Sequence, residues 1–281
     1  MRTILLLFML VIMNASAFSL FGGPDEKQIQ KIAYLDSVKD LIVATQKTRG
    51  LTNNFMNGNV VAQLLVYNER NEMKKALKSL KRQKATVDGA TQEKVAELAK
   101  ALKQLNKKAF KQKSAQTFQD YTDMINKMLV LGSEVAYASF GKSDTFSQQA
   151  SALMMDIVLP LTEQIGKTRG LGSGIVARGH SLDVEVPKMT DFVNEVENLS
   201  GKLTTNTKAI YIANAKRYPS NLGKQVEAID SQIRTYVALT RSKVIGQKEI
   251  TLDPNDYFDQ GTAAISKVLT IFTINKNALT Q

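Results

Sequence analysis

The feature that most constrains the fold is an internal repeat, carried by two pairs of motifs in the same order. Gln46–Leu51 and Gly166–Leu171 share Lys-Thr-Arg-Gly-Leu at an offset of 120 residues. A second set returns at an offset of 140 residues: Phe118, Thr122, Ile125, Lys127 and Leu129 match Phe258, Thr262, Ile265, Lys267 and Leu269. Chance could produce either match alone, but two matches in one order indicate a duplication.

Each half of the repeat reads as helical. Apolar residues recur at helical spacing almost throughout, and no segment alternates with period two. Helix boundaries are well marked: Asp253-Pro254, for example, pairs an N-cap with proline at the first helical position. We expect breaks near residues 58–59, 87–90, 113–114, 140–143, 179–183, 217–221 and 250–254. The eight helices that result predict an all-α fold of two tandem four-helix bundles, at residues 18–142 and 143–281.

Residues 1–17 have the features of a secretory signal peptide. Arg2 supplies a positive charge, Ile4–Met13 is an unbroken apolar run, and Ala15-Ser16-Ala17 is an A-x-A cleavage site. Ten apolar residues are too few to cross a bilayer comfortably. We therefore expect cleavage after Ala17 and export, most simply into a bacterial periplasm. A retained N-terminal anchor is the alternative.

The chain carries a net charge of +11, and nearly all of it lies in one segment. Residues 74–113 hold thirteen Lys or Arg against Asp88, Glu93 and Glu97. This basic segment is either the solvated face of two antiparallel helices or a patch for anionic lipid or an acidic partner surface. Because an exported protein does not meet a genome, we expect no nucleic-acid partner.

Three arginines fall on apolar helical faces without an acidic neighbour. Arg49 shares a face with Ile42 and Thr45, and Arg169 follows Ile165 by one turn. Arg241 has only apolar residues at its neighbour positions: Val237, Ala238, Val244 and Ile245. A cation in such surroundings needs a counter-charge. Either distant acids satisfy these arginines across helix interfaces, or an exogenous anion does.

Small and hydroxylated residues accompany two of these arginines. Gly50 and Gly170 each cost a helix interior about 1 kcal/mol relative to alanine. They indicate either a close helix crossing or, beside unpaired arginines, a small cavity, which we favour. With Thr48 and Thr168 they complete a candidate anion site. A guanidinium prefers planar or multi-oxygen anions, such as carboxylate, nitrate, nitrite or sulfate.

Composition argues against catalysis. The chain has one histidine, His180, and no cysteine, which removes multi-histidine metal sites and thiol chemistry. No paired carboxylates share a helical face beside the arginines. We therefore expect no enzyme, no metal and no cofactor, with His180 at the surface and the methionines, including Met154-Met155, in the core.

The arginine motifs resemble the NIT domain, the nitrate- and nitrite-sensing domain. Its first-helix signature is Gln-x-Glu/Thr-Arg-Gly followed by a small or apolar residue, which residues 46–51 fit well and residues 166–171 fit without the glutamine. Arg241, Phe258 and Thr262 look like a later family pattern. The resemblance implies two four-helix bundles holding the anion where they meet, with Arg49, Arg169 and Arg241 as ligands. Thr48 stands where family members can carry a second arginine, and the first half, with Asn106 and Lys107 in that region, lacks a counterpart of Arg241.

The resemblance also implies a biological role. NIT domains usually accompany a kinase, chemoreceptor or antiterminator output, and this chain resembles the free-standing periplasmic nitrate sensor that reports to a membrane histidine kinase. Bound nitrate, or nitrite, would bridge the bundles and favour one orientation. The alternatives are a helical adaptor acting through residues 74–113, and the same anion site used for a small carboxylate. A homodimer is left open.

Overall fold

A computed structural model describes residues 26–281, which form helices and no strand. The signal peptide expected at residues 1–17 lies outside the described residues. Within them, no helix combines the length and apolar character that a membrane crossing requires. The all-α expectation is confirmed.

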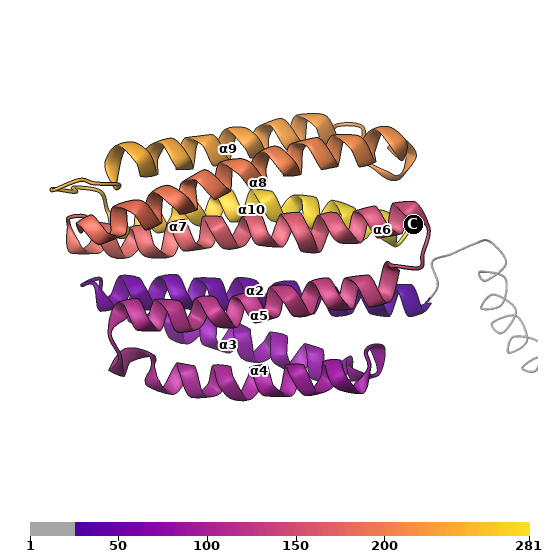
Figure 1. Cartoon of the computed structure of the whole chain (residues 1–281), viewed down its shortest axis with the longest axis horizontal. Coiled ribbons are helices and arrows are strands. Elements are labelled where there is room, and N and C mark those ends of the chain that lie inside the picture. The colour runs from indigo at the N-terminus through magenta and orange to yellow at the C-terminus, as the bar shows by residue number, and fades with distance from the viewer. Residues whose placement is uncertain (1–25) are drawn as a thin grey trace, which may run out of the picture.

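The first half contains four helices. These are α2 (Glu26–Met56), α3 (Ala62–Arg82), α4 (Gly89–Lys108) and α5 (Ser114–Phe140), with short 3-10 turns at Lys84–Thr86 and Ala109–Lys111. In Figure 1, α2 and α5 lie next to the other half, whereas α3 and α4 form the outer layer. Two of these helices, α3 and α4, are amphipathic, with buried residues along one face and charged residues along the other.

The second half repeats this arrangement with α7, α8, α9 and α10. Its first helix is continuous from Thr145 to Arg178: α6 (Thr145–Ala152) passes through a π-helical segment (Leu153–Val158) into α7 (Leu159–Arg178). It is followed by α8 (Val186–Ala213), α9 (Leu222–Lys243) and α10 (Pro254–Leu279), with 3-10 turns at Asp183–Glu185 and Ala215–Arg217. All seven expected breaks fall between these helices. The arrangement is consistent with the expected duplication.

Local sequence explains where several helices begin and end. Asp88, Asp144 and Asp253 cap α4, α6 and α10, each accepting backbone N–H bonds, and Pro254 opens α10. Gly179 ends α7 with φ of +83°, in the left-handed region that glycine adopts readily. Most of the extra residues of the second half lie in α8, which has 28 residues against 21 in α3, and in the loop before α10.

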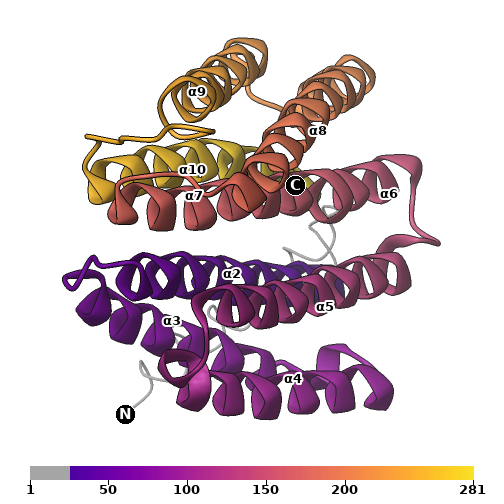
Figure 2. The ribbon, with the colours of Figure 1, turned by 60° about the vertical axis from the view of Figure 1, so that its left-hand side comes forward.

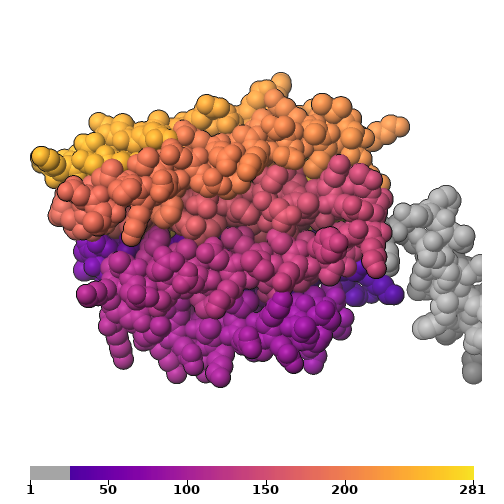
Figure 3. Space-filling model, viewed as in Figure 1, coloured from indigo at the N-terminus to yellow at the C-terminus, as the bar shows by residue number. Residues whose placement is uncertain are grey.

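The two halves pack through their first and last helices. Figure 2 shows α2 and α5 facing α7 and α10, and the halves are in contact along the face seen in Figure 3. Because α2 has neighbours on both sides, seven consecutive residues from Thr48 to Asn54 are buried. Such burial cannot arise on a helix with one solvent face, so the arginine motifs lie in the interior.

Candidate functional site

Arg49 is completely buried on α2, and a carboxylate of the other half neutralises it. Its Nη1 donates to Glu163 Oε1 of α7 at 2.5 Å, and Nη2 donates to Glu163 Oε2 at 3.2 Å. Nη1 also donates to Thr122 Oγ1 at 2.9 Å, and the guanidinium lies 4.9 Å from the ring centre of Phe118. A distant acid across a helix interface therefore satisfies Arg49.

Arg169 is equally buried on α7 but has no such acid. Its Nη1 donates to Thr262 Oγ1 at 2.8 Å, and its guanidinium lies 4.4 Å from the ring centre of Phe258. Nε and Nη2 are buried without a hydrogen-bond partner, and no carboxylate of the described residues forms an ion pair with it. Burial lowers the pKa of Arg169 from its ordinary value to about 10. The group stays protonated near neutral pH, and this shift corresponds to a cost of about 3 kcal/mol for holding the charge in the fold.

The two arginines otherwise have equivalent surroundings. Each stacks on a phenylalanine and donates to the threonine one turn further along the last helix of its own half: Phe118 and Thr122 for Arg49, Phe258 and Thr262 for Arg169. The second pair of repeated motifs, on the last helices, therefore supplies the side chains that contact the arginines of the first pair. The equivalence breaks at Glu163, because Val43 occupies the matching position of the first half. One arginine is neutralised and the other is not.

Gly50 and Gly170 mark a close crossing of α2 and α7. A Cβ added to Gly50 would lie 3.3 Å from Gly170 Cα and 2.8 Å from Phe258 Cε2. One added to Gly170 would lie 3.1 Å from Gly50 Cα and 3.0 Å from Phe118 Cε2. The expectation of a small cavity at these glycines is therefore wrong, because backbone atoms and aromatic rings occupy that space. What the glycines provide is contact between the halves.

Two other glycines make room for the guanidinium groups. A Cβ at Gly166 would lie 3.2 Å from Arg49 Nη2, and one at Gly261 would lie 2.9 Å from Arg169 Cβ and Cγ. The same Cβ would lie 3.0 Å from Cζ of Tyr236, which places the Tyr236 hydroxyl end near Arg169. That hydroxyl is buried without a hydrogen-bond partner. Arg169 Nε, Arg169 Nη2 and the Tyr236 hydroxyl are three unused polar groups in one region.

Thr48 and Thr168 are buried, but their hydroxyl protons are used within their own helices. Thr48 Oγ1 donates to Ala44 O at 2.8 Å, and Thr168 Oγ1 donates to Gln164 O at 2.9 Å. A threonine bonded in this way has no proton left for an anion. The hydroxyls beside the guanidinium groups are those of Thr122 and Thr262, which donate to their own helices in the same way and accept from the arginines.

Arg241 does not lie where its sequence neighbours suggest. Its side chain is 40% exposed, and Nη2 donates to Asn194 Oδ1 and to Glu197 Oε2 of α8, both at 2.8 Å. The expectation of apolar surroundings is therefore wrong, and the counter-charge is a distant acid across a helix interface, one of the two alternatives left open from the sequence. The physical reason is that α8 lies alongside α9 and brings an acid that no local spacing reveals. The structure does not bring Arg241 to the other two arginines.

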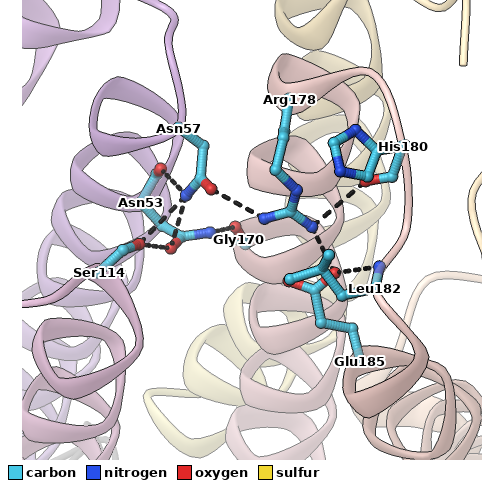
Figure 4. A network of polar contacts seen from close by, with 8 residues as sticks. All are labelled: Asn53, Asn57, Ser114, Gly170, Arg178, His180, Leu182 and Glu185. Atoms are coloured by element: carbon cyan, nitrogen blue, oxygen red, sulfur yellow. Dashed lines mark hydrogen bonds and ion pairs between the residues drawn. The ribbon is translucent and has the colours of Figure 1, made fainter.

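A polar network joins the halves at the end of α2 and α7, close to the arginine motifs (Figure 4). Asn53 Nδ2 donates to Gly170 O at 2.9 Å, directly across the helix crossing. Arg178 Nη1 donates to Asn57 Oδ1 at 3.0 Å, and its Nη2 pairs with Glu185 at the turn before α8. Movement of α2 against α7 would have to break these bonds.

Sequence reasoning missed Glu163 and Tyr236. Glu163 precedes Lys167 by four residues, a spacing that reads as an ordinary surface pair, and its true partner comes from another helix. Tyr236 has no motif signal at all. His180 is exposed, and Met154 and Met155 are buried in the core, as expected.

Comparisons with known proteins give a family and a similar fold. A family model described as nitrate and nitrite sensing matches residues 40–271, a range that includes both arginines and their stacking partners. The solved structure of the NasR transcription antiterminator is similar in fold, with a TM-score of 0.66 and 14% sequence identity. The similarity covers 96% of this chain and 73% of the NasR chain. A search of curated proteins gave no significant match.

Proposed function

Because the chain belongs to the nitrate and nitrite sensing family, we propose that it is an exported sensor that binds nitrate at Arg169 and reports to a membrane histidine kinase. The family is one of signalling domains and not of enzymes. Export rests on the apolar run and A-x-A site of residues 1–17. The kinase partner rests on the resemblance to periplasmic nitrate sensors of the family.

The observation that carries the ligand assignment is the unpaired guanidinium edge of Arg169. Nε and Nη2 are the two donors with which arginine binds planar oxyanions side by side. Nitrate is planar and presents two oxygens to such an edge. It would also remove the cost of about 3 kcal/mol that burial imposes on the uncompensated charge. Arg49 cannot serve in the same way, since Glu163 already holds its Nη1 and Nη2.

Buried charge supports a monovalent anion. Arg49, Glu163 and Arg169 are the charged side chains buried among residues 26–281, and together they leave one positive charge. One nitrate or nitrite ion brings the interior to neutrality, whereas sulfate would leave one negative charge there. Glu163 is therefore the residue that sets the valence of the ligand.

Signalling would follow from the position of the site near the crossing of the halves. Phe258, which stacks on Arg169, also lies against Gly50 of the other half. An anion at Arg169 would favour the arrangement of α2, α7 and α10 that fits this stack, by no more than its difference in affinity between arrangements. Small-angle scattering with and without saturating nitrate measures that change, and identical curves would contradict the switch.

The proposal is tested by thermal unfolding in nitrate, nitrite, chloride, sulfate and acetate at matched ionic strength. A ligand that binds only the folded state at a hundred times its dissociation constant adds about 2.7 kcal/mol. We expect nitrate and nitrite to raise Tm, and Arg169→Met to abolish the rise. Arg241→Met, which changes charge equally on an exposed helix face, should retain it. A rise with acetate alone would assign the site to a carboxylate, and no ion-specific rise would refute anion sensing.

A further inference from the structure

A basic groove runs between the two outer helices of the first half, outside the arginine site. It has a volume of about 720 Å³. Six of its lining residues are cationic and none is acidic: Arg70, Lys74, Lys78, Lys81, Lys103 and Lys107. The groove therefore concentrates positive charge in a concave surface, where low-dielectric walls strengthen the field.

The groove exists because α3 and α4 pack mainly on other helices. The buried face of α3 lies along α2, and that of α4 lies on α5, so the two touch each other only slightly. In Figure 2 they diverge along their length. Met73, Leu77 and Ala99 also line the groove and are buried or half-buried, whereas its lysines are exposed, so the groove has an apolar floor between basic walls.

The cations on the walls have no acidic partners. The ion pairs of this hairpin involve residues outside the groove: Lys75 with Glu72, Lys94 with Glu134, and Lys108 with Asp120. Within the groove, Lys74 bonds to the amide of Asn71 and Arg70 to the hydroxyl of Tyr121. Lys78 and Lys103 form no ion pair among the described residues. Like charges held together without counter-charges favour an acidic occupant.

We propose that this groove binds an acidic amphipathic helix of a partner protein. An apolar floor takes the apolar stripe of such a helix, and the walls pair with carboxylates on its flanks. The cations from Arg70 to Lys81 extend over about 16 Å at the rise of an α-helix, or three turns. A lipid carries its charge at one end, whereas a helix can place carboxylates along that whole length. Nucleic acid would make no use of the apolar floor.

The test uses a fluorescent peptide of roughly 18 residues, about five helical turns, with leucines along one face and glutamates on the others. Binding to the full chain is measured by anisotropy against two control peptides. One has the same composition in scrambled order, and the other has glutamine in place of glutamate. We expect only the acidic amphipathic peptide to bind, with an affinity that falls as the salt concentration rises. Equal binding of the scrambled peptide, or no binding at any salt concentration, would overturn the proposal.

Two substitutions on α4 provide a matched pair. Lys103→Glu reverses a charge in the groove wall, and Lys100→Glu makes the same change outside it. Lys103→Glu should weaken peptide binding at least about tenfold, and Lys100→Glu less than about twofold. Equal effects of the two would contradict a specific groove. Binding of both variants to vesicles of anionic lipid is measured as well. If Lys103→Glu weakens vesicle binding more than peptide binding, the groove is a membrane-binding surface and the helix proposal is overturned.

The nitrate-dependent rise in Tm, measured on the same variants, keeps this proposal separate from the anion site. Both variants should retain it, because the groove and the α2–α7 crossing are on different sides of α3. A variant that loses peptide binding but keeps the nitrate-dependent rise in Tm is changed at the groove and not at the anion site.

Discussion

The carboxylate of Glu163 on α7 reaches the guanidinium of Arg49 on α2, with Nη1 and Oε1 2.5 Å apart. This ion pair joins the halves and uses the only acid buried among residues 26–281. Arg169, in matching surroundings, is left with its charge uncompensated. In the proposed function, this difference between two otherwise equivalent arginines makes Arg49 structural and leaves Arg169 to bind the anion.

Replacing each arginine by methionine should therefore have opposite effects on stability without nitrate. Arg49→Met leaves the Glu163 carboxylate buried and unpaired, which should cost about 3–5 kcal/mol. For a chain of this size that lowers Tm by roughly 6–20 °C. Arg169→Met removes a buried cation and should leave Tm unchanged or raise it.

The double substitution Arg49→Met with Glu163→Leu serves as the control. It removes both charges of the pair and should recover most of the lost stability, as apolar replacements of buried ion pairs often do. Equal destabilisation by Arg49→Met and Arg169→Met, measured by calorimetry in chloride, would show that the two arginines are not different in kind.

Glu163→Gln should change which anions bind. Glutamine keeps an acceptor for Arg49 but raises the buried charge by one, so a divalent anion becomes electrically matched. We expect sulfate, inert towards the unmodified protein, to raise the Tm of the variant at matched ionic strength. Glu72→Gln, at an exposed pair with Lys75, is the control and should change nothing. An unaltered response to sulfate would remove Glu163 from the account of selectivity.

Alanine at the helix crossing should destabilise the fold, against its usual effect in a helix. Gly50→Ala would press Cβ against Phe258 and Gly170, and overpacking of this kind costs about 1–3 kcal/mol. Gly201→Ala is the matched control, because nothing lies within 4 Å of its Cβ on the exposed face of α8. There alanine should stabilise by up to about 1 kcal/mol. Urea denaturation of both variants measures these changes in the free energy of unfolding. Stabilisation by Gly50→Ala would mean that α2 and α7 are further apart than described.

Nitrate binding should disappear as pH rises through the pKa of Arg169. Burial places that pKa at about 10, so the guanidinium is charged and binds at pH 7 but loses its proton above pH 10. Tyr257 stays neutral in this range, since burial raises its pKa to about 12.

The stability of the unliganded protein should respond to the same group with the opposite sign. Arg169 has a lower pKa in the folded than in the unfolded state, so above about pH 10 the unfolded state binds more protons and this contribution to stability rises with pH. Titration of the lysines affects Tm equally in nitrate and in chloride. The difference in Tm between the two salts therefore isolates the effect of nitrate binding. A difference that stays constant to pH 11 would contradict the assignment to Arg169.

Sequence reasoning recovered the parts of this structure that depend on local spacing. Helical periodicity, Asp253-Pro254 and the glycine at position 179 placed the helices and their breaks. The repeat pointed to Arg49 and Arg169, whose burial is confirmed. It also contained the stacking residues Phe118 and Phe258, although their contact with the arginines could not be read from it.

What failed depends on packing between helices. Arg241 has apolar neighbours on its own helix, but α8 supplies Glu197, and no spacing along α9 reveals that. Glu163 was overlooked for the same reason. The glycines of the motif were ambiguous between a crossing and a cavity until the partner helix was in place.

A crystal structure of the protein grown with nitrate tests the central claim most directly. The account predicts one nitrate at Nε and Nη2 of Arg169, at about 2.8–3.0 Å, within reach of the Tyr236 hydroxyl, with the Arg49–Glu163 pair intact. Nitrate bound at Arg49 with Glu163 displaced, or no nitrate at either arginine, would contradict it.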